Sequence, residues 1–244
     1  KFGCLRDEKF AEKMDEYIIF KNLDGKYLTL KDYLEAAKEK HENKVFYVTD
    51  EKEQSQYINM FREEKLDAVI LTHNIDNPFI THEEQKHEGV KFLRIDADVN
   101  EMFKEEVKEE DKEALEQEAK TLTETFRKAL GNDKLEVKVE KLKNESVSSM
   151  ITVAEETRRM QEMMKMYNMY GMDPSMFGGT GEVLVLNANN SLVKYVLEHG
   201  EGEETPVICE QLYDLALLSH GSLSPERMTK FIARSNEIMA KLAK

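Results

Sequence analysis

The feature that most restricts the possible folds is the alternation of short apolar runs with helical patterns between residues 45 and 95. Residues 45–49, 67–72 and 91–95 are runs typical of strands, and residues 50–63 and 78–88 between them have the character of helices. Strands joined by crossover helices form parallel sheets with helices on both faces. The sequence therefore predicts a small three-layer α/β/α unit over residues 1–98.

Shorter signals complete this unit. Apolar side chains at helical spacing predict a helix over residues 7–20, and the Asp24-Gly25 pair predicts a turn after it. Thr29 followed by Asp32 forms a capping-box pattern, which predicts that a second helix begins there and runs through residue 38. Asp50, with an acidic residue three positions later, is the expected cap of the next helix.

A second domain is expected over residues 99–244, because a strongly acidic stretch follows residue 100. Residues 112–130 carry one apolar stripe that ends at Gly131, which predicts a long amphipathic helix. Residues 135–139, 150–153 and 183–186 resemble strands of a small antiparallel or mixed sheet. The predicted fold class is therefore α/β followed by a mixed α+β domain that ends in helices.

The last two predicted helices, residues 205–221 and 224–242, are unusually apolar. The first is apolar almost all the way round, and the second carries a stripe about 120° wide. A hairpin of this kind at a chain end favours association with a second copy, although both helices could instead close their own domain. The expected dimerisation residues are Ile208, Leu212, Leu215, Leu218, Met228, Phe231, Ile232, Ile238, Met239 and Leu242.

Methionines concentrate in residues 158–177, which contain seven of the thirteen in the chain. Methionine fills irregular cores, but it also builds adaptable binding surfaces. The charged residues before the segment and the glycines after it favour an exposed surface over a core. The candidate binding residues are Met160, Met163, Met164, Met166, Tyr167, Met169, Tyr170 and Met172.

Composition excludes several classes of protein. A formal net charge of −14 would repel the phosphates of nucleic acid, and the longest apolar run is too short for a membrane helix. No secretory signal is present at the start, and Lys1 in place of an initiator methionine suggests a fragment of a longer protein. Two cysteines, Cys4 and Cys209, suit a reducing compartment, so a cytoplasmic location is expected.

No pattern of catalytic or metal-binding residues stands out. His82 and His87 are five residues apart, which places the two imidazoles on different sides of a helix and argues against zinc. Residues 178–181 are rich in glycine but lack the lysine of a phosphate-binding loop. Asp50 and Asp76 are weak candidates for a phosphoacceptor. The alternative to a binding protein is a small-molecule enzyme that uses the carboxyl edge of the parallel sheet.

Eight segments carry a family resemblance, in the same order along the whole chain. They are residues 2–20, 24–30 (DGKYLTL), 45–49 (VFYVT), 89–92 (GVKF), 148–152 (SSMIT), 158–164 (RRMQEMM), 186–189 (LNAN) and 212–218 (LYDLALL). The first four resemble the late middle domain of bacterial heat-shock protein 90 chaperones, the HtpG group. The last four are similar to the C-terminal domain of the same family.

The resemblance implies a chaperone that acts as a homodimer, joined by a four-helix bundle of the last two helices of each copy. It also implies that the methionine-rich segment faces unfolded or partly folded client proteins. The nucleotide-binding motifs of the family and its catalytic arginine have no counterpart in this chain. ATP and magnesium are therefore expected to bind to other parts of the parent protein, and this piece is expected to be non-catalytic and without a cofactor.

Overall fold

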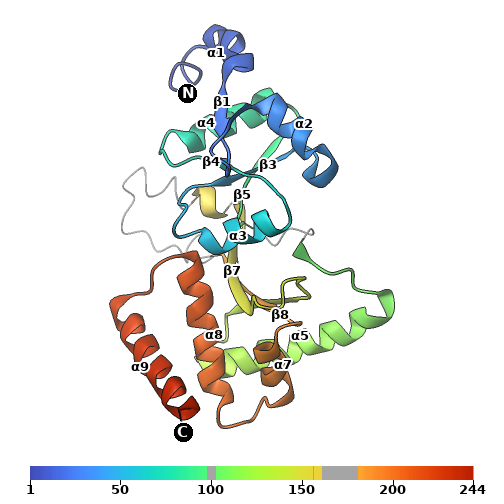
Figure 1. Ribbon diagram of the computed structural model, residues 1–244, viewed down its shortest axis with the longest axis vertical. Coiled ribbons are helices and arrows are strands. Elements are labelled where there is room, and N and C mark those ends of the chain that lie inside the picture. Colours follow the sequence, from blue (N-terminus) through green and yellow to red (C-terminus); the bar gives the residue numbers. More distant parts are fainter. Residues whose placement is uncertain (98–102, 156, 161–180, 244) are drawn as a thin grey trace. The chain divides into compact units, whose positions relative to one another are not determined.

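The computed structural model describes residues 1–97, 103–155, 157–160 and 181–243 (Figure 1). It divides into two compact units. Unit 1 comprises Lys1–Asp98 together with Glu155–Met172, and unit 2 comprises Val99–Ala154 together with Asp173–Lys244. The chain therefore returns to unit 1 after residue 154. A single domain boundary near residue 99 does not account for this return.

Unit 1 contains a three-stranded sheet in the order β4-β3-β5, in which both outer strands run parallel to β3. An antiparallel hairpin of β1 and β2 precedes it and turns at Gly25, whose φ of +78° suits glycine. The elements are α1 (Glu8–Met14), the 3₁₀ helix η1 (Asp15–Tyr17), β1 (Ile19–Lys21), β2 (Tyr27–Thr29), α2 (Leu30–His41), β3 (Lys44–Val48), α3 (Ser55–Glu63), β4 (Val69–Ile70), α4 (Asp76–Lys86) and β5 (Lys91–Arg94).

Helices cover both faces of this sheet. Successive side chains of β3 point to opposite faces and therefore pack against different helices. Tyr47 is fully buried in one core cluster, together with Phe79 of α4. Phe46 points to the opposite face, where its ring meets that of Phe61 on α3 edge-to-face at a centroid distance of 5.0 Å. The predicted three-layer arrangement is thus present in unit 1.

Local signals were accurate at some helix ends and misleading at others. The capping box is present, since the Thr29 hydroxyl accepts from the Asp32 amide at 3.1 Å and the Asp32 carboxylate accepts from the Thr29 amide at 3.4 Å. The helix expected over residues 7–20 is wrong beyond Met14, where η1 and then β1 follow. Asp50 caps a turn and not a helix, because its carboxylate accepts from the amides of residues 52 and 53 while α3 begins at Ser55.

Unit 2 contains a mixed sheet in the order β6-β8-β7, with β6 parallel and β7 antiparallel to β8. Its elements are α5 (Glu109–Leu130), β6 (Glu136–Glu140), β7 (Ser149–Val153), β8 (Glu182–Asn187), α7 (Ser191–Glu198), α8 (Thr205–His220) and α9 (Pro225–Leu242). As predicted, α5 ends at Gly131 in the left-handed conformation, with a φ of +59°. Helix α7 was not expected from the sequence.

The core of unit 2 joins α5, the sheet, α7 and α8. Phe126 of α5, Leu184 of β8 and Leu212 of α8 are each at most 1% exposed and belong to one apolar cluster. Helix α9 lies alongside α8 (Figure 1) and contributes none of its side chains to this cluster. Within the described residues, no helix is both long enough and apolar enough to cross a lipid bilayer.

Candidate dimerisation and client-binding surfaces

Helix α9 is attached to α8 by ionic and polar contacts. Arg227 and Arg234 both pair with the buried carboxylate of Asp214. Arg234 also pairs with Glu210 at 2.6 Å and donates from Nε to the Gln211 side chain at 2.8 Å. Arg234 is the one buried residue among those described in α9. The side of α9 that faces α8 is therefore fixed mainly by charge.

The apolar stripe of α9 lies about 100° around the helix from this arginine face, at 100° per residue. Three of its side chains remain strongly exposed: Ile232 at 52%, Met239 at 58% and Leu242 at 83%. Leu215 of α8 is also exposed, at 42%. We call the following set the α9 stripe: Met228, Phe231, Ile232, Ile238, Met239 and Leu242.

The expected dimerisation residues thus fall into different environments. Leu212 is 1% exposed and lies in the core of unit 2, so it is not available to a partner and the expectation for it must be corrected. Ile208 is half-buried against the same core. Leu218, Met228, Phe231 and Ile238 are half-buried as well. The helical wheel of α8 could not separate these residues because the helix is apolar all round.

A cavity of about 350 Å³ lies beside these contacts, lined by residues of α8, α9 and the end of α5. Three basic residues of its lining, Arg227, Lys230 and Arg234, are matched by three acidic ones, Glu210, Asp214 and Glu226. The bases are paired with these acids, Lys230 with Glu226 at 3.1 Å. A cavity with balanced charge is a poor site for a polyphosphate such as ATP.

The start of the methionine-rich segment is held on unit 1 by a group of ionic contacts that we call the Glu155 clasp. The Glu155 carboxylate accepts from the Tyr47 hydroxyl at 2.8 Å and pairs with Arg158 and Arg159. Arg159 continues to the carboxylate of Glu84, with bonds of 2.8 and 3.1 Å. The Arg158 side chain is only 3% exposed, and its ion pair with Glu155 helps to offset the cost of burying its charge.

The clasp also covers the edge of the sheet. Strand β5 is an edge strand, yet the Phe92 amide donates to Glu84 at 2.7 Å and the Phe92 carbonyl accepts from Arg159 at 2.8 Å. The Arg94 amide donates to Glu155 at 3.1 Å. Side chains therefore satisfy backbone groups that would otherwise be open to pairing with another strand.

Electrostatics favours the ionised form of Glu155. Burial alone would raise the pKa of its carboxyl, but the hydrogen bonds and charges of Arg158 and Arg159 hold that pKa below its ordinary value. The pKa of the Tyr47 hydroxyl is raised by burial and by the adjacent Glu155 charge, so the tyrosine stays a neutral donor. The clasp is therefore an ionic lock at neutral pH.

Of the expected client-binding residues, Met160 is described and is 42% exposed. It follows directly after the clasp. The other seven, Met163, Met164, Met166, Tyr167, Met169, Tyr170 and Met172, lie outside the described residues. Their use as a binding surface therefore remains a prediction.

The carboxyl edge of the parallel sheet, where an enzyme site was considered as the alternative, is closed by its own side chains. The Gln54 carbonyl oxygen accepts from the amides of Thr49 and Asp50 at 2.8 and 3.1 Å. Arg94 at the end of β5 pairs with the buried Asp96. Most of these polar groups are therefore engaged within unit 1, which disfavours a substrate site at this edge.

Sequence reasoning missed the residues that hold these surfaces in place. Arg227 and Arg234 are seven residues apart on α9 and therefore share one face of the helix. This spacing could have predicted an ionic contact with an acidic residue on the preceding helix. The Glu155 clasp had no such signal, because its partners Tyr47 and Glu84 are far away in the sequence.

Comparison with known proteins gives the family of the chain. The sequence model of the family described as "Hsp90 protein" matches residues 1–244, the whole chain. The chain belongs to the Hsp90 family. It is 32% identical over 220 residues to the chaperone protein HtpG of Bacteroides thetaiotaomicron, which covers 85% of this chain and 31% of that protein.

Two further Hsp90 relatives give the same result. Chaperone protein HtpG of Bacteroides fragilis strain YCH46 is 33% identical over 215 residues, covering 83% of this chain and 30% of the relative. The HtpG of Porphyromonas gingivalis strain ATCC 33277 is 28% identical over 222 residues, covering 86% of this chain and 32% of the relative. The chain thus spans about a third of the length of the Hsp90 proteins it matches.

Proposed function

We propose that this chain is the homodimerising and client-binding part of an Hsp90-family chaperone and that it has no ATPase activity of its own. Two buried free cysteines, Cys4 and Cys209, support a reducing, cytoplasmic location. The partners we propose are a second copy of the chain and unfolded or partly folded proteins. Measurable ATP turnover by the purified chain would contradict the non-catalytic part of the proposal.

The exposed α9 stripe carries the dimer proposal. Three of its side chains, Ile232, Met239 and Leu242, stay mostly exposed, because α9 meets α8 largely through its arginines. Full burial of a large apolar side chain contributes about 1.5–3 kcal/mol. In a two-fold dimer the stripe of each protomer is buried. The gross gain must exceed the association cost of about 4–15 kcal/mol to leave the net energy of about 8 kcal/mol that a micromolar complex needs.

Sedimentation of the chain beside a version that ends at Ser224 tests the proposal. The truncation removes α9 but keeps α8, whose Cys209, Leu212 and Ala216 are needed in the core of unit 2. We expect the complete chain to form a dimer of twice 28.4 kDa at micromolar concentration and the shortened chain to stay monomeric. A complete chain that stays monomeric throughout would refute the dimer.

Client binding by the methionine-rich segment needs its own test. Met160 stands exposed just after the clasp, which supports a solvent-facing start of the segment. Replacing Met163, Met164 and Tyr167 with glutamine should abolish suppression of client aggregation while the circular dichroism spectrum stays unchanged. A matched control replaces Tyr17, Tyr27 and Leu192, which are exposed elsewhere. Equal loss in both variants, or no loss in the first, would refute a client-binding role for this segment.

A further inference from the structure

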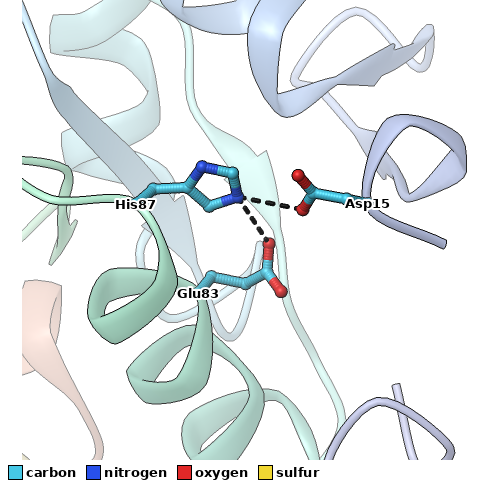
Figure 2. Close-up of side chains that lie close together, drawn as sticks. All are labelled: Asp15, Glu83 and His87. Atoms are coloured by element: carbon cyan, nitrogen blue, oxygen red, sulfur yellow. Dashed lines mark hydrogen bonds and ion pairs between the residues drawn. The ribbon is translucent and has the colours of Figure 1, made fainter. Parts of the chain in front are cut away.

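Asp15, Glu83 and His87 bring their side chains together in unit 1, although they come from two elements (Figure 2). Asp15 is the first residue of η1. Glu83 and His87 lie four residues apart at the end of α4, a spacing that places them on one face. His87 Nε2 is 3.0 Å from Asp15 Oδ1 and 3.7 Å from Glu83 Oε2. One ligand atom of each residue lies within 4.8 Å of the others.

The buried carboxylate of Glu83 would be stabilised by a bound cation. Its side chain is 2% exposed, and its Oε1 atom finds no hydrogen-bond partner among the described residues. A buried carboxylate with an unsatisfied oxygen is costly unless a positive charge compensates it.

Lys86 compensates only part of the negative charge. Its Nζ atom lies 2.9 Å from Asp15 Oδ1 and donates to the Ala11 carbonyl at 3.0 Å. Two carboxylates, those of Asp15 and Glu83, thus face the single ammonium of Lys86. Metal binding through Asp15 Oδ1 would require Lys86 to give up this oxygen and keep its bond to the Ala11 carbonyl.

The geometry points to a divalent metal site, with Zn²⁺ as the ion, formed by Asp15, Glu83 and His87. One imidazole nitrogen and two carboxylate oxygens are ligands that Zn²⁺ accepts, at about 2.0–2.2 Å, which places neighbouring ligand atoms of a tetrahedral site about 3.3 Å apart. The observed separations of 3.0 and 3.7 Å bracket this value. Imidazole favours zinc over Mg²⁺ and Ca²⁺.

The site leaves room for solvent. Asp15 and His87 are 27% and 30% exposed, so water can complete the coordination from the open side. Nε2 of His87 faces both carboxylates, so the imidazole binds as the tautomer with its proton on Nδ1. A bound ion would join η1 to α4 and thereby fix the N-terminal segment of unit 1.

Zinc and cobalt titrations of the untagged, EDTA-treated chain test the site. We expect one Zn²⁺ per chain by calorimetry, and a visible absorption band on addition of Co²⁺ that Zn²⁺ displaces. Glu83→Gln and His87→Ala should each weaken Zn²⁺ binding at least tenfold. His73→Ala removes an exposed histidine of the same unit and should change nothing.

Asp15→Asn provides a further variant that keeps side-chain size if either α4 substitution disturbs the fold. Zn²⁺ should raise the midpoint of thermal unfolding of the natural chain and should do so less for Asp15→Asn. The proposal would be overturned if the chain showed no saturable Zn²⁺ binding with a dissociation constant below about 100 µM. Binding that survives both Glu83→Gln and His87→Ala would overturn it as well.

Discussion

Replacing two exposed residues of the α9 stripe gives the sharpest test of how this chain associates. Ile232→Ala with Met239→Ala removes apolar side chains that are 52% and 58% exposed in the single chain. Alanine has the highest helix propensity, so α9 itself is not weakened. Neither residue takes part in the arginine contacts with α8. Any effect should therefore appear in association and not in folding.

The size of the effect follows from the exposed surface. Complete burial of such a side chain contributes about 1.5–3 kcal/mol, so the exposed half leaves about 1 kcal/mol to be gained at each position. Two positions in two protomers give about 4 kcal/mol. At 1.4 kcal/mol for each tenfold change, the dissociation constant should rise about a thousandfold.

Sedimentation velocity over about 0.1–100 µM chain would measure this change, since the range brackets a micromolar dissociation constant. Glu237→Ala is the matched control, because Glu237 is exposed on the side of α9 away from the stripe. The control should dimerise like the natural chain. The reasoning fails if the double variant, with an unchanged circular dichroism spectrum, keeps the natural dissociation constant, because the stripe would then not be the interface.

Three other substitutions test the interior. Glu155→Gln removes the carboxylate that pairs with the buried Arg158 and should destabilise unit 1 by about 3 kcal/mol in denaturant unfolding at pH 7. The pKa of Glu155 in the folded protein lies below its ordinary value, so its ionised carboxylate stabilises the fold above the unfolded pKa. This stabilisation is lost as the pH falls through the folded pKa. The unfolding free energies of the natural and Glu155→Gln proteins should therefore converge in acid. A difference that persists in acid would contradict an ionic clasp. Leu212→Ala should cost about 2–5 kcal/mol of stability, measured by thermal unfolding, and a change in dimer affinity without loss of stability would show that Leu212 is an interface residue. Burial raises the pKa of the Cys209 thiol to about 12, so in a Cys4→Ser background this thiol should react with Ellman's reagent at pH 8 only after unfolding, and rapid reaction in the folded state would disprove its burial.

Elements whose signals come from adjacent residues were predictable from the sequence. The capping box at Thr29 and Asp32, the left-handed Gly131 after α5, and the Ser224-Pro225 start of α9 all depend on residues within one helical turn. Propensity and capping act over that distance, so the pattern and the structure agree.

Features that depend on distant partners were less accessible. Strand β4 is limited to Val69 and Ile70, which pair with Tyr47 and Val48 at the end of β3, although the apolar run in the sequence is longer. Residues 191–198 form a helix of only two turns, which is too short for a periodicity argument. On α8, the choice of Leu212 for the core depends on which side α5 and the sheet cover.

The metal candidates show the same limit. The sequence argued against a pair of His82 and His87, because five residues of helix separate the two imidazoles. The structure pairs His87 with Glu83 one turn earlier and with Asp15 from a different element. No local pattern contains that third residue, so the group could not be found before the fold was known.

The Glu155 clasp decides how this protein can be divided. A cut after residue 98 would remove Glu155 and Arg159 from the outer strand of the first sheet. The Phe92 carbonyl, the Arg94 amide and the Tyr47 hydroxyl would then lose these hydrogen-bond partners. Open strand margins of this kind recruit other chains. The first hundred residues expressed alone would therefore tend to self-associate through β5. A soluble fragment would need Glu155 and Arg159 of the Glu155 clasp added on a separate peptide.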